Sequence, residues 1–290
     1  MALHLQTFKT RALTSVAFVI VMLFGLFINH WSFFLLFSII HFGCWYEFKK
    51  LIGEIEPEYK RISSIHFYAV MLAGWGFMLW MTNNAYTIDK IKLSEAGWYL
   101  MLVNLIALPV IEILLSRNFN LKTLLISVCG LLYISFSCGC MIDLRSEGMI
   151  FGSLFGIDLG LVLPLLVIVT IWINDTMAYI VGSLIGKTPL TSISPKKTRE
   201  GTTGGILLAV ITVTLCGYFF LNADVGQLII ISFISCIAGI FGDLLESKLK
   251  RMAGLKDSGN IMPGHGGFLD RFDSLLFATI FVWLYVKLFL

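Results

Sequence analysis

The chain has 290 residues, of which 58% are hydrophobic and 13% are charged, and its mean hydropathy is +0.88. A soluble domain carries about 25% charged residues, so the composition excludes an ordinary soluble enzyme and indicates a membrane protein. The net charge of +3 is small and dispersed, which argues against a nucleic-acid partner. The six cysteines lie in apolar runs, and a secreted disulfide scaffold is therefore excluded as well.

Apolar runs long enough to cross a bilayer, about 20 residues each, recur along the whole chain. Nine spans are predicted, at residues 12–29, 31–48, 63–82, 97–116, 121–141, 159–186, 204–222, 226–246 and 272–290. Basic residues precede the first run as in a signal peptide, but no small-residue cleavage site follows, so we expect this run to be retained. The predicted fold is an all-α, polytopic membrane protein with a single membrane domain over 1–290. It divides into N-terminal helices (1–158) and a part with helices and cytoplasmic loops that carries the chemistry (159–290).

The distribution of Lys and Arg predicts the orientation. With a cytoplasmic N-terminus, 17 of the 21 basic residues lie in cytoplasmic segments. The four outside are Lys90, Lys92, Arg145 and Lys287. The positive-inside rule requires such an asymmetry. We therefore expect 83–96 and 142–158 to be external loops without chemistry, and 187–203 and 247–271 to face the cytoplasm from the plasma (inner) membrane.

Asp175 is the only charged residue between Asp158 and Lys187, inside a predicted span. A carboxylate in a spanning helix costs about 2.5–3.5 kcal/mol on insertion scales. We therefore expect Asp175 to face a cavity, and we assign it to substrate binding. Gly182 and Gly186 follow at G-x-x-x-G spacing, which favours close packing against another helix.

A basic segment follows this span. No strand precedes it and its glycine spacing differs from a Walker loop, which argues against P-loop chemistry. Its cations, hydroxyls and small residues nevertheless form the set that binds polyphosphates. The residues assigned to substrate binding are Lys187, Ser194, Lys196, Lys197, Thr198 and Glu200. The alternative is that the segment is basic only because it is cytoplasmic.

The densest polar cluster precedes and begins the last predicted span. Asp243, Glu246 and Lys250 recur at i, i+3 and i+7, on one face of a predicted helix, and Asp270 and Asp273 share a second helical face. Hard carboxylate oxygens suit Mg²⁺, which uses one or two carboxylates plus substrate phosphates. The metal candidates are Asp243, Asp270, Glu246 and Asp273, with a second cation left open. A solvated charged loop is the alternative.

His265 is the only one of five histidines in a glycine-bounded polar loop. The glycines beside it let the backbone approach a ligand closely, and both substrate contact and a structural role are open for His265. The catalytic candidates are Asp243, Asp270, Lys250, Arg251, His265 and Arg271. The remaining substrate-binding candidates are Lys256, Asp257, Gly266 and Gly267.

These motifs resemble the signature of the phosphatidate cytidylyltransferase (CDP-diacylglycerol synthase) family. The matching stretches are Ser247-Lys248-Leu249-Lys250-Arg251, Lys256-Asp257-Ser258-Gly259, His265-Gly266-Gly267-Phe268 and Asp270-Arg271-Phe272-Asp273. Asp175-Thr176-x-Ala178-Tyr179 and Ser194–Gly201 are similar to the family too. Met262 stands where Leu, Ile or Phe is usual, and Arg199 where an aromatic residue is common. The resemblance covers 159–290, while the N-terminal half agrees only in being helical and apolar.

The resemblance implies transfer of CMP from CTP to phosphatidate, with release of pyrophosphate and with Mg²⁺ as cofactor. The paired metal-binding acids of the family map onto Asp243 and Asp270. The implied partners are CTP, phosphatidate and the lipid bilayer, with a homodimer left open. Two other classes stay open. One is a secondary transporter with an intramembrane Asp, and the other is a CTP-dependent lipid-alcohol kinase, which would produce CDP.

Overall fold

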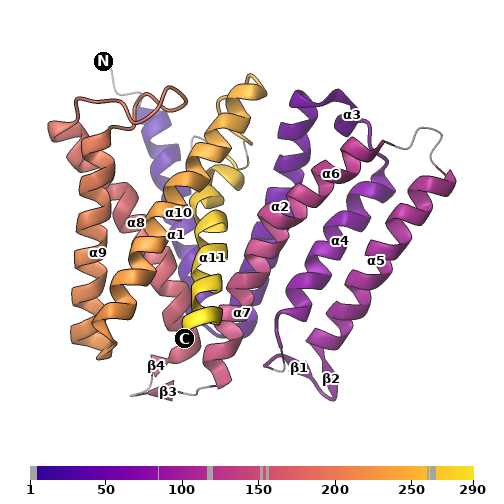
Figure 1. Cartoon of the computed structure of the whole chain (residues 1–290), viewed down its shortest axis with the longest axis horizontal. Helices are drawn as coiled ribbons and strands as arrows, with labels where there is room; N and C mark the ends of the chain where they lie inside the picture. The colour runs from indigo at the N-terminus through magenta and orange to yellow at the C-terminus, as the bar shows by residue number, and fades with distance from the viewer. Residues whose placement is uncertain are drawn as a thin grey trace. The chain divides into compact units, whose positions relative to one another are not determined.

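The structure is a computed structural model that describes residues 5–83, 85–115, 120–150, 153–154, 157–259, 261 and 266–290. It is almost entirely helical (Figure 1). The chain forms two compact units. The first unit consists of Met1–Glu147 and Met252–Phe272, and the second of Gly148–Arg251 and Asp273–Leu290. The glycine-rich segment before the last helix therefore belongs with the N-terminal helices, although the sequence grouped it with the C-terminal part.

The first unit is built from helices. They are α1 (Leu5–Phe27), α2 (His30–Ile55), α3 (Pro57–Lys60), α4 (Ser64–Trp80), α5 (Leu93–Leu115), α6 (Leu121–Gly130), the π-helix η1 (Leu131–Phe136) and most of α7 (Ser137–Ile150). Helix α2 begins with a capping box, in which Asn29 and Ser32 each bond the backbone of the other. Helix α4 packs along α5, where Gly76 allows a close approach: a methyl group there would lie 2.7 Å from the Met101 nitrogen.

Helices α6, η1 and α7 form one continuous helical stretch with a π-helical turn in its middle. Such turns insert a residue into the helix and are found mostly as single turns. Here the turn carries Ser135, whose hydroxyl lies 2.9 Å from Nε2 of His41 and accepts a 3.0 Å bond from the Trp45 indole. The π-turn thus brings a hydroxyl group to two polar ring nitrogens of α2 inside the core.

Both expected external loops contain regular structure, while their external location stays a prediction. In 83–96, β1 (Thr87–Ile88) pairs antiparallel with β2 (Ile91–Lys92), and α5 already begins. In 142–158, α7 continues as far as Ile150. In this helix Asp143 is buried and accepts a 2.8 Å hydrogen bond from Asn83, a contact that hydropathy does not detect.

The second unit contains the short hairpin of β3 (Ser153–Leu154) and β4 (Ile157–Asp158), followed by α8 (Leu159–Ile185), α9 (Arg199–Leu221), α10 (Val225–Met252) and most of α11 (Leu269–Phe289). Helices α8 and α9 pack closely. A methyl group on Gly201 would lie 2.8 Å from the Cα of Gly182, which confirms that Gly182 serves helix packing. Thr198 caps α9 by accepting a 3.1 Å bond from the Gly201 N–H.

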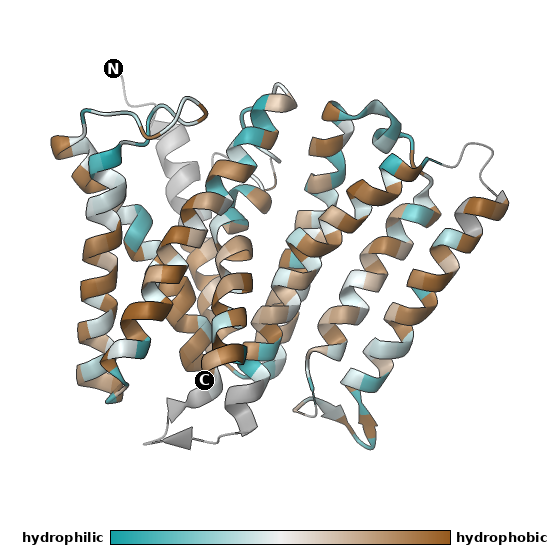
Figure 2. Cartoon of the chain, viewed as in Figure 1, coloured by the Kyte–Doolittle hydropathy of each residue, from teal (hydrophilic) through white to brown (hydrophobic). Residues whose placement is uncertain are grey.

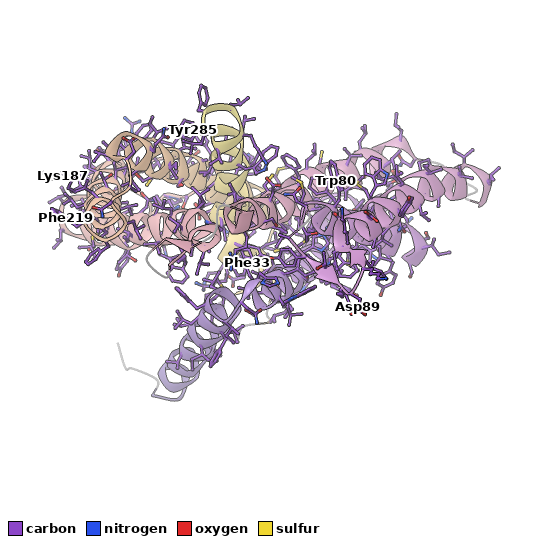
Figure 3. The ribbon with its side chains drawn as sticks, turned by 90° about the horizontal axis from the view of Figure 1, so that it is seen from below. Phe33, Trp80, Asp89, Lys187, Phe219 and Tyr285 are labelled. Atoms are coloured by element: carbon purple, nitrogen blue, oxygen red, sulfur yellow. The ribbon has the colours of Figure 1, made fainter. Side chains whose placement is uncertain are left out.

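Six helical stretches of the described chain are long and apolar enough to cross a membrane. They are Leu93–Val110, Leu121–Ser146, Gly160–Ile185, Arg199–Leu221, Val225–Met252 and Leu269–Phe289. Brown, hydrophobic residues dominate the helices in Figure 2, and side chains such as Phe219 project outward in Figure 3. Because Leu114 is 74% exposed and Phe220 79%, these surfaces require apolar surroundings.

The chain is therefore a multi-pass, nearly all-α membrane protein. Each of the nine predicted runs is helical, including the three in α1, α2 and α4. The count of nine crossings and the cytoplasmic N-terminus stay predictions.

Candidate functional site

A cavity of about 460 Å³ lies in the second unit. Its lining comes from α8, the loop before α9, and the helices α9 and α10. The lining residues are Asn174, Asp175, Ala178, Tyr179, Gly182, Ser183, Lys196, Lys197, Thr198, Thr202, Ile240 and Asp243. Five residues predicted to bind substrate or metal thus meet in one cavity, although they come from three separate stretches of sequence.

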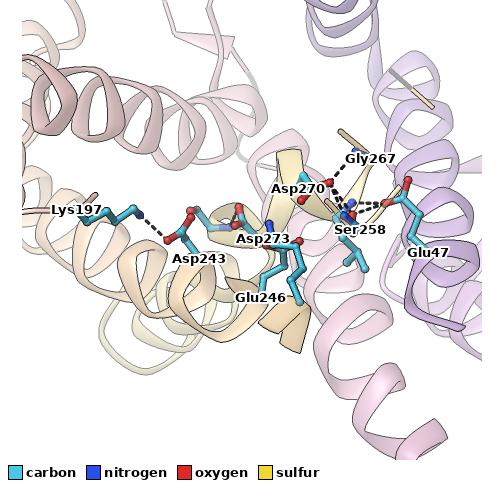
Figure 4. A network of polar contacts seen from close by, with 11 residues as sticks. Glu47, Lys197, Asp243, Glu246, Ser258, Gly267, Asp270 and Asp273 are labelled. Carbon is cyan, nitrogen blue, oxygen red and sulfur yellow. Dashed lines mark hydrogen bonds and ion pairs between the residues drawn. The ribbon is translucent and has the colours of Figure 1, made fainter. Parts of the chain in front are cut away.

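Lys197 and Asp243 form an ion pair across the cavity lining, with 2.5 Å between the Lys197 Nζ and an Asp243 carboxylate oxygen (Figure 4). The backbone around the lysine is fixed as well. Its N–H donates to the Ser194 carbonyl at 3.1 Å, and its carbonyl accepts from the Leu190 N–H at 2.7 Å. The loop therefore presents the ammonium group to α10 in a defined position.

Glu200 fastens the two ends of this loop. Its carboxylate accepts the N–H groups of Lys187 and Thr188, each at 3.2 Å. The Arg199 N–H donates to the Thr188 carbonyl at 2.9 Å, beside a bridge that pairs Pro189 with Thr198. Lys187, Ser194 and Glu200, all predicted to bind substrate, lie outside the described lining of the cavity. Glu200 shapes the loop that carries the lining lysines, and substrate contact by these three residues stays a prediction.

The α8 side of the cavity contains polar residues that the sequence assignment omitted. Asn174 is only 3% exposed, and its amide nitrogen lies 3.3 Å from an Asp175 oxygen. Its carbonyl oxygen has no hydrogen-bond partner among the described residues. Tyr179 lines the cavity four residues after Asp175. The sequence already placed Tyr179 in the stretch that resembles the family, at helical i, i+4 spacing from Asp175, but did not assign it to the site.

Three further charged residues of the second unit surround Asp243. Glu246 is buried and forms an ion pair with Lys250 one turn later on α10, which confirms the predicted charged face of this helix. Asp273, at the start of α11, is buried and accepts the Ser274 N–H at 2.6 Å. Its charge interacts with those of Asp243, Lys250 and Asp175. Asp273 therefore links the charge of Lys250 on α10 with those of the cavity residues Asp175 and Asp243.

The donor set suits a hard cation. No group of three or more His, Cys, Asp or Glu side chains in the described residues gathers as a ready metal site. Mg²⁺ needs only one or two carboxylates, however, since substrate phosphates and water complete its shell. Within the second unit, Asp243 and Asp273 are two carboxylates whose charges interact, and a metal ion between them stays a prediction. A metal shared by Asp243 and Asp270 would join the two units and stays a prediction.

The first unit contains a separate polar network at the glycine-rich segment (Figure 4). Asp270 Oδ2 accepts the N–H groups of Ser258 and Gly267, both at 2.8 Å, and the Ser258 hydroxyl lies 2.9 Å away. Glu47 Oε2 lies 2.9 Å from the same hydroxyl and accepts the Leu269 N–H at 2.9 Å. Glu47 was absent from the sequence assignment. As the only Asp, Glu, Lys or Arg of the predicted span 31–48, it carried a signal that could have found it.

The other candidates of the signature lie around this network or outside it. Lys256 and Asp257 are exposed on the segment after α10, as are Arg251 at the end of α10 and Arg271 on α11. Gly266 has a φ of +84°, a left-handed conformation that favours glycine. His265 lies outside the described residues.

Comparison with known proteins shows the relationship of the chain. Residues 9–289 match the cytidylyltransferase family. A phosphatidate cytidylyltransferase of Bacillus subtilis (strain 168) is 34% identical over 224 residues, which cover 76% of this chain and 77% of that protein. One of Helicobacter pylori (strain J99 / ATCC 700824) is 43% identical over 135 residues, or 46% of this chain, and the match spans about half (51%) of that relative's length. One of Staphylococcus haemolyticus (strain JCSC1435) is 46% identical over 121 residues, or 41% of this chain and 46% of that protein. The chain belongs to the cytidylyltransferase family.

Proposed function

We propose that the protein is a phosphatidate cytidylyltransferase, which transfers CMP from CTP to phosphatidate and releases pyrophosphate. The observation that carries the proposal is the cavity in which Lys196 and Lys197 meet Asp175 and Asp243. Its volume of about 460 Å³ falls within the range of about 300–1,000 Å³ that small-molecule sites occupy. The names of the relatives support the same activity, and family membership favours it over a transporter.

The reaction joins two polyanions. An oxygen of the phosphatidate phosphomonoester attacks the α-phosphorus of CTP. A new phosphorus–oxygen bond forms, the bond to the oxygen bridging the α- and β-phosphorus atoms breaks, and pyrophosphate leaves with that oxygen. The second pKa of a phosphomonoester is about 6, so the attacking group is already largely a dianion at neutral pH. The site therefore needs cations and accurate positioning more than a strong base.

The residues of the cavity supply these needs. Lys196 and Lys197 lie directly before α9, whose N-terminus favours negative charge, so the triphosphate is proposed to bind there. When it does, Lys197 can exchange its bond with Asp243 for one with a phosphate oxygen. The proposed cofactor Mg²⁺ would be held by Asp243 and Asp273 and would neutralise phosphate charge.

A lipid substrate explains why such a site belongs to a membrane protein. The exposed apolar side chains of the helices match the acyl chains of phosphatidate, which can stay in the bilayer. Only the head group must reach the polar residues. We place the site at the cytoplasmic face of the plasma membrane, where CTP is available, because the Lys-rich loop before α9 belongs to the predicted cytoplasmic segments.

The test is a product assay on the purified full chain in lipid nanodiscs. Pyrophosphate and CDP-diacylglycerol should appear in equal amounts, and only when CTP, phosphatidate and Mg²⁺ are all present. Formation of CDP and a phosphorylated lipid alcohol would replace the proposal with the kinase alternative. Uptake of a solute into vesicles without CTP turnover would replace it with the transporter.

A further inference from the structure

Helix α2 presents a buried carboxylate to the glycine-rich segment. Glu47 is 4% exposed, and its Oε2 is the acceptor for the Leu269 N–H and the Ser258 hydroxyl. Its Oε1 has no hydrogen-bond partner among the described residues. A buried, incompletely bonded carboxylate is costly for folding. Its presence therefore points to a purpose beyond the packing of α2.

The Ser258 hydroxyl connects this carboxylate to Asp270. The hydroxyl oxygen lies 2.9 Å from Glu47 Oε2 and 2.9 Å from Asp270 Oδ2. Because the hydroxyl has one hydrogen, it donates to one carboxylate at a time. The backbone N–H groups of Ser258, Gly267 and Leu269 complete the network. Glu47 thus holds both the start and the end of the segment that fixes the orientation of Asp270.

Steric fit supports the same contact. A methyl group on Gly259 or Gly267 would collide with the Glu47 carboxylate. One turn earlier on α2, a methyl group on Gly43 would collide with the ring of Phe268. One face of α2 is therefore shaped to receive two parts of the segment.

We propose that Glu47 is a positioning residue for the transfer reaction, acting through Ser258 on Asp270. It holds Ser258 and Leu269 so that the Asp270 carboxylate keeps the orientation that the reaction needs, and it does not touch the substrate. The inference rests on the proposed function and on the sequence-based prediction that Asp270 takes part in catalysis. It gives a role to a residue of the N-terminal half of the chain, which the family signature does not include.

The first test compares Glu47→Ala with Glu47→Gln in the full chain. Glutamine keeps an acceptor oxygen for Leu269 and Ser258, so its kcat should stay within about threefold of the parent. Alanine removes the acceptor and should lower kcat by about 10–100-fold, the usual effect of losing a residue that orients a site. The KM for CTP should change by less than about twofold, because the nucleotide cavity lies in the other unit. Equal activity of Glu47→Ala and the parent would overturn the proposal.

Two control variants separate positioning from simple loss of stability. Ser127→Ala removes a buried hydroxyl that bonds Tyr59 and His66 in the same unit, without contact to the segment. It should lower the thermal unfolding midpoint while kcat per folded molecule stays unchanged. Glu54→Ala removes an exposed carboxylate from the same helix, and should change neither quantity. If Glu47→Ala behaves like Ser127→Ala, Glu47 stabilises the fold only.

A second readout does not need activity. Lys256 is exposed two residues before Ser258, so trypsin cleavage after Lys256 reports how firmly Ser258 is held. Cleavage should be faster in Glu47→Ala than in the parent, and unchanged in Glu47→Gln and Glu54→Ala. If the parent performs no transfer but these rates differ, the proposed function fails while the contact stands. Unchanged cleavage in Glu47→Ala, with an active parent, would refute the positioning role itself.

A double-mutant cycle tests the contact directly. Gly259→Ala should lower kcat in the parent, because its methyl group collides with the Glu47 carboxylate. In Glu47→Ala the collision is absent, so the same substitution should cost several-fold less. Non-additivity of this kind identifies residues in contact. Strictly additive effects would show that Glu47 and the segment do not meet.

Discussion

Lys197 neutralises Asp243 through a 2.5 Å ion pair that joins the loop before α9 to α10. Both side chains are partly buried, and Asp243 also interacts with the charges of Asp175 and Asp273. In the absence of ligand, the lysine is thus the local counterion of an acidic cluster. A divalent cation and a triphosphate would each compete for one member of this pair, so both partners should affect catalysis.

Asp243→Asn keeps the shape of the side chain but removes its charge. We expect pyrophosphate release to fall by at least about 100-fold, because such a loss of electrostatic stabilisation costs about 10²–10³ in kcat. The thermal unfolding midpoint should change little, since Asn still accepts a bond from Lys197. The matched control is Asp224→Asn, just before α10, where Asp224 accepts the Gln227 N–H at 2.8 Å. Asn is an equally good cap, so this variant should keep full activity, and an active Asp243→Asn would remove Asp243 from the reaction.

Lys197→Met removes the ammonium group and keeps most of the apolar stem. A hydrogen bond between charged groups is worth about 1.5–3 kcal/mol, so kcat/KM for CTP should fall by about 10–150-fold. Lys197→Arg should recover part of the loss. Lys248→Met serves as control, because Lys248 is exposed on α10 and outside the described cavity lining. Comparable losses in Lys197→Met and Lys248→Met would mean that only the overall surface charge matters.

Gly205→Ala should loosen the packing of α8 against α9. The added methyl group would lie 2.7 Å from the Asn174 carbonyl oxygen and 2.8 Å from the Ala178 Cβ. Overpacking of this kind costs about 1–3 kcal/mol, which thermal unfolding of the detergent-solubilised protein can measure. Gly226→Ala, in the first turn of α10, meets only Asp224 and should change stability by less than about 1 kcal/mol. A Gly205→Ala protein as stable as the parent would contradict the close α8–α9 contact.

The predicted orientation can be tested with single cysteines at Lys60 and Lys90 in a chain whose six native cysteines are replaced by serine. Both positions are exposed, and they lie at opposite ends of α4 in the chain. If the N-terminus is cytoplasmic, a membrane-impermeant maleimide labels Lys90→Cys in intact cells and labels Lys60→Cys only after permeabilisation. The reverse pattern would place the predicted nucleotide loop outside the cell. Such a pattern would conflict with the use of cytoplasmic CTP.

Most of the fold could be predicted from hydropathy, because membrane spans are encoded locally. The boundaries of the helices could not always be predicted in this way. Helix α9 begins at Arg199, whereas the apolar run begins at residue 204, because Thr198 supplies a cap that lets polar residues form the first turn. The π-turn at Leu131–Phe136 has no counterpart in the hydrophobic pattern either. Only the structure reveals this turn, together with the contact that its Ser135 makes with α2.

The candidate site was predictable to the extent that its residues follow local motifs. Asp175, Lys197 and Asp243 each stood out in the sequence, and the structure brings them to one cavity. The Glu47 contact was different, because it spans 211 residues between Glu47 and Ser258 and neither helical spacing nor charge pattern identifies the partner. Only the folded chain shows which glycines its carboxylate requires.

The contact of Glu47 on α2 with Ser258 and Leu269 limits how the protein can be divided into parts. Transplanting residues 159–290 onto another membrane scaffold would move Ser258 and Leu269 without the oxygen that accepts their hydrogen bonds. Such a chimaera would carry every motif of the signature and still lack the surface that shapes it. A chimaera of this protein therefore has to include α2 together with the signature residues.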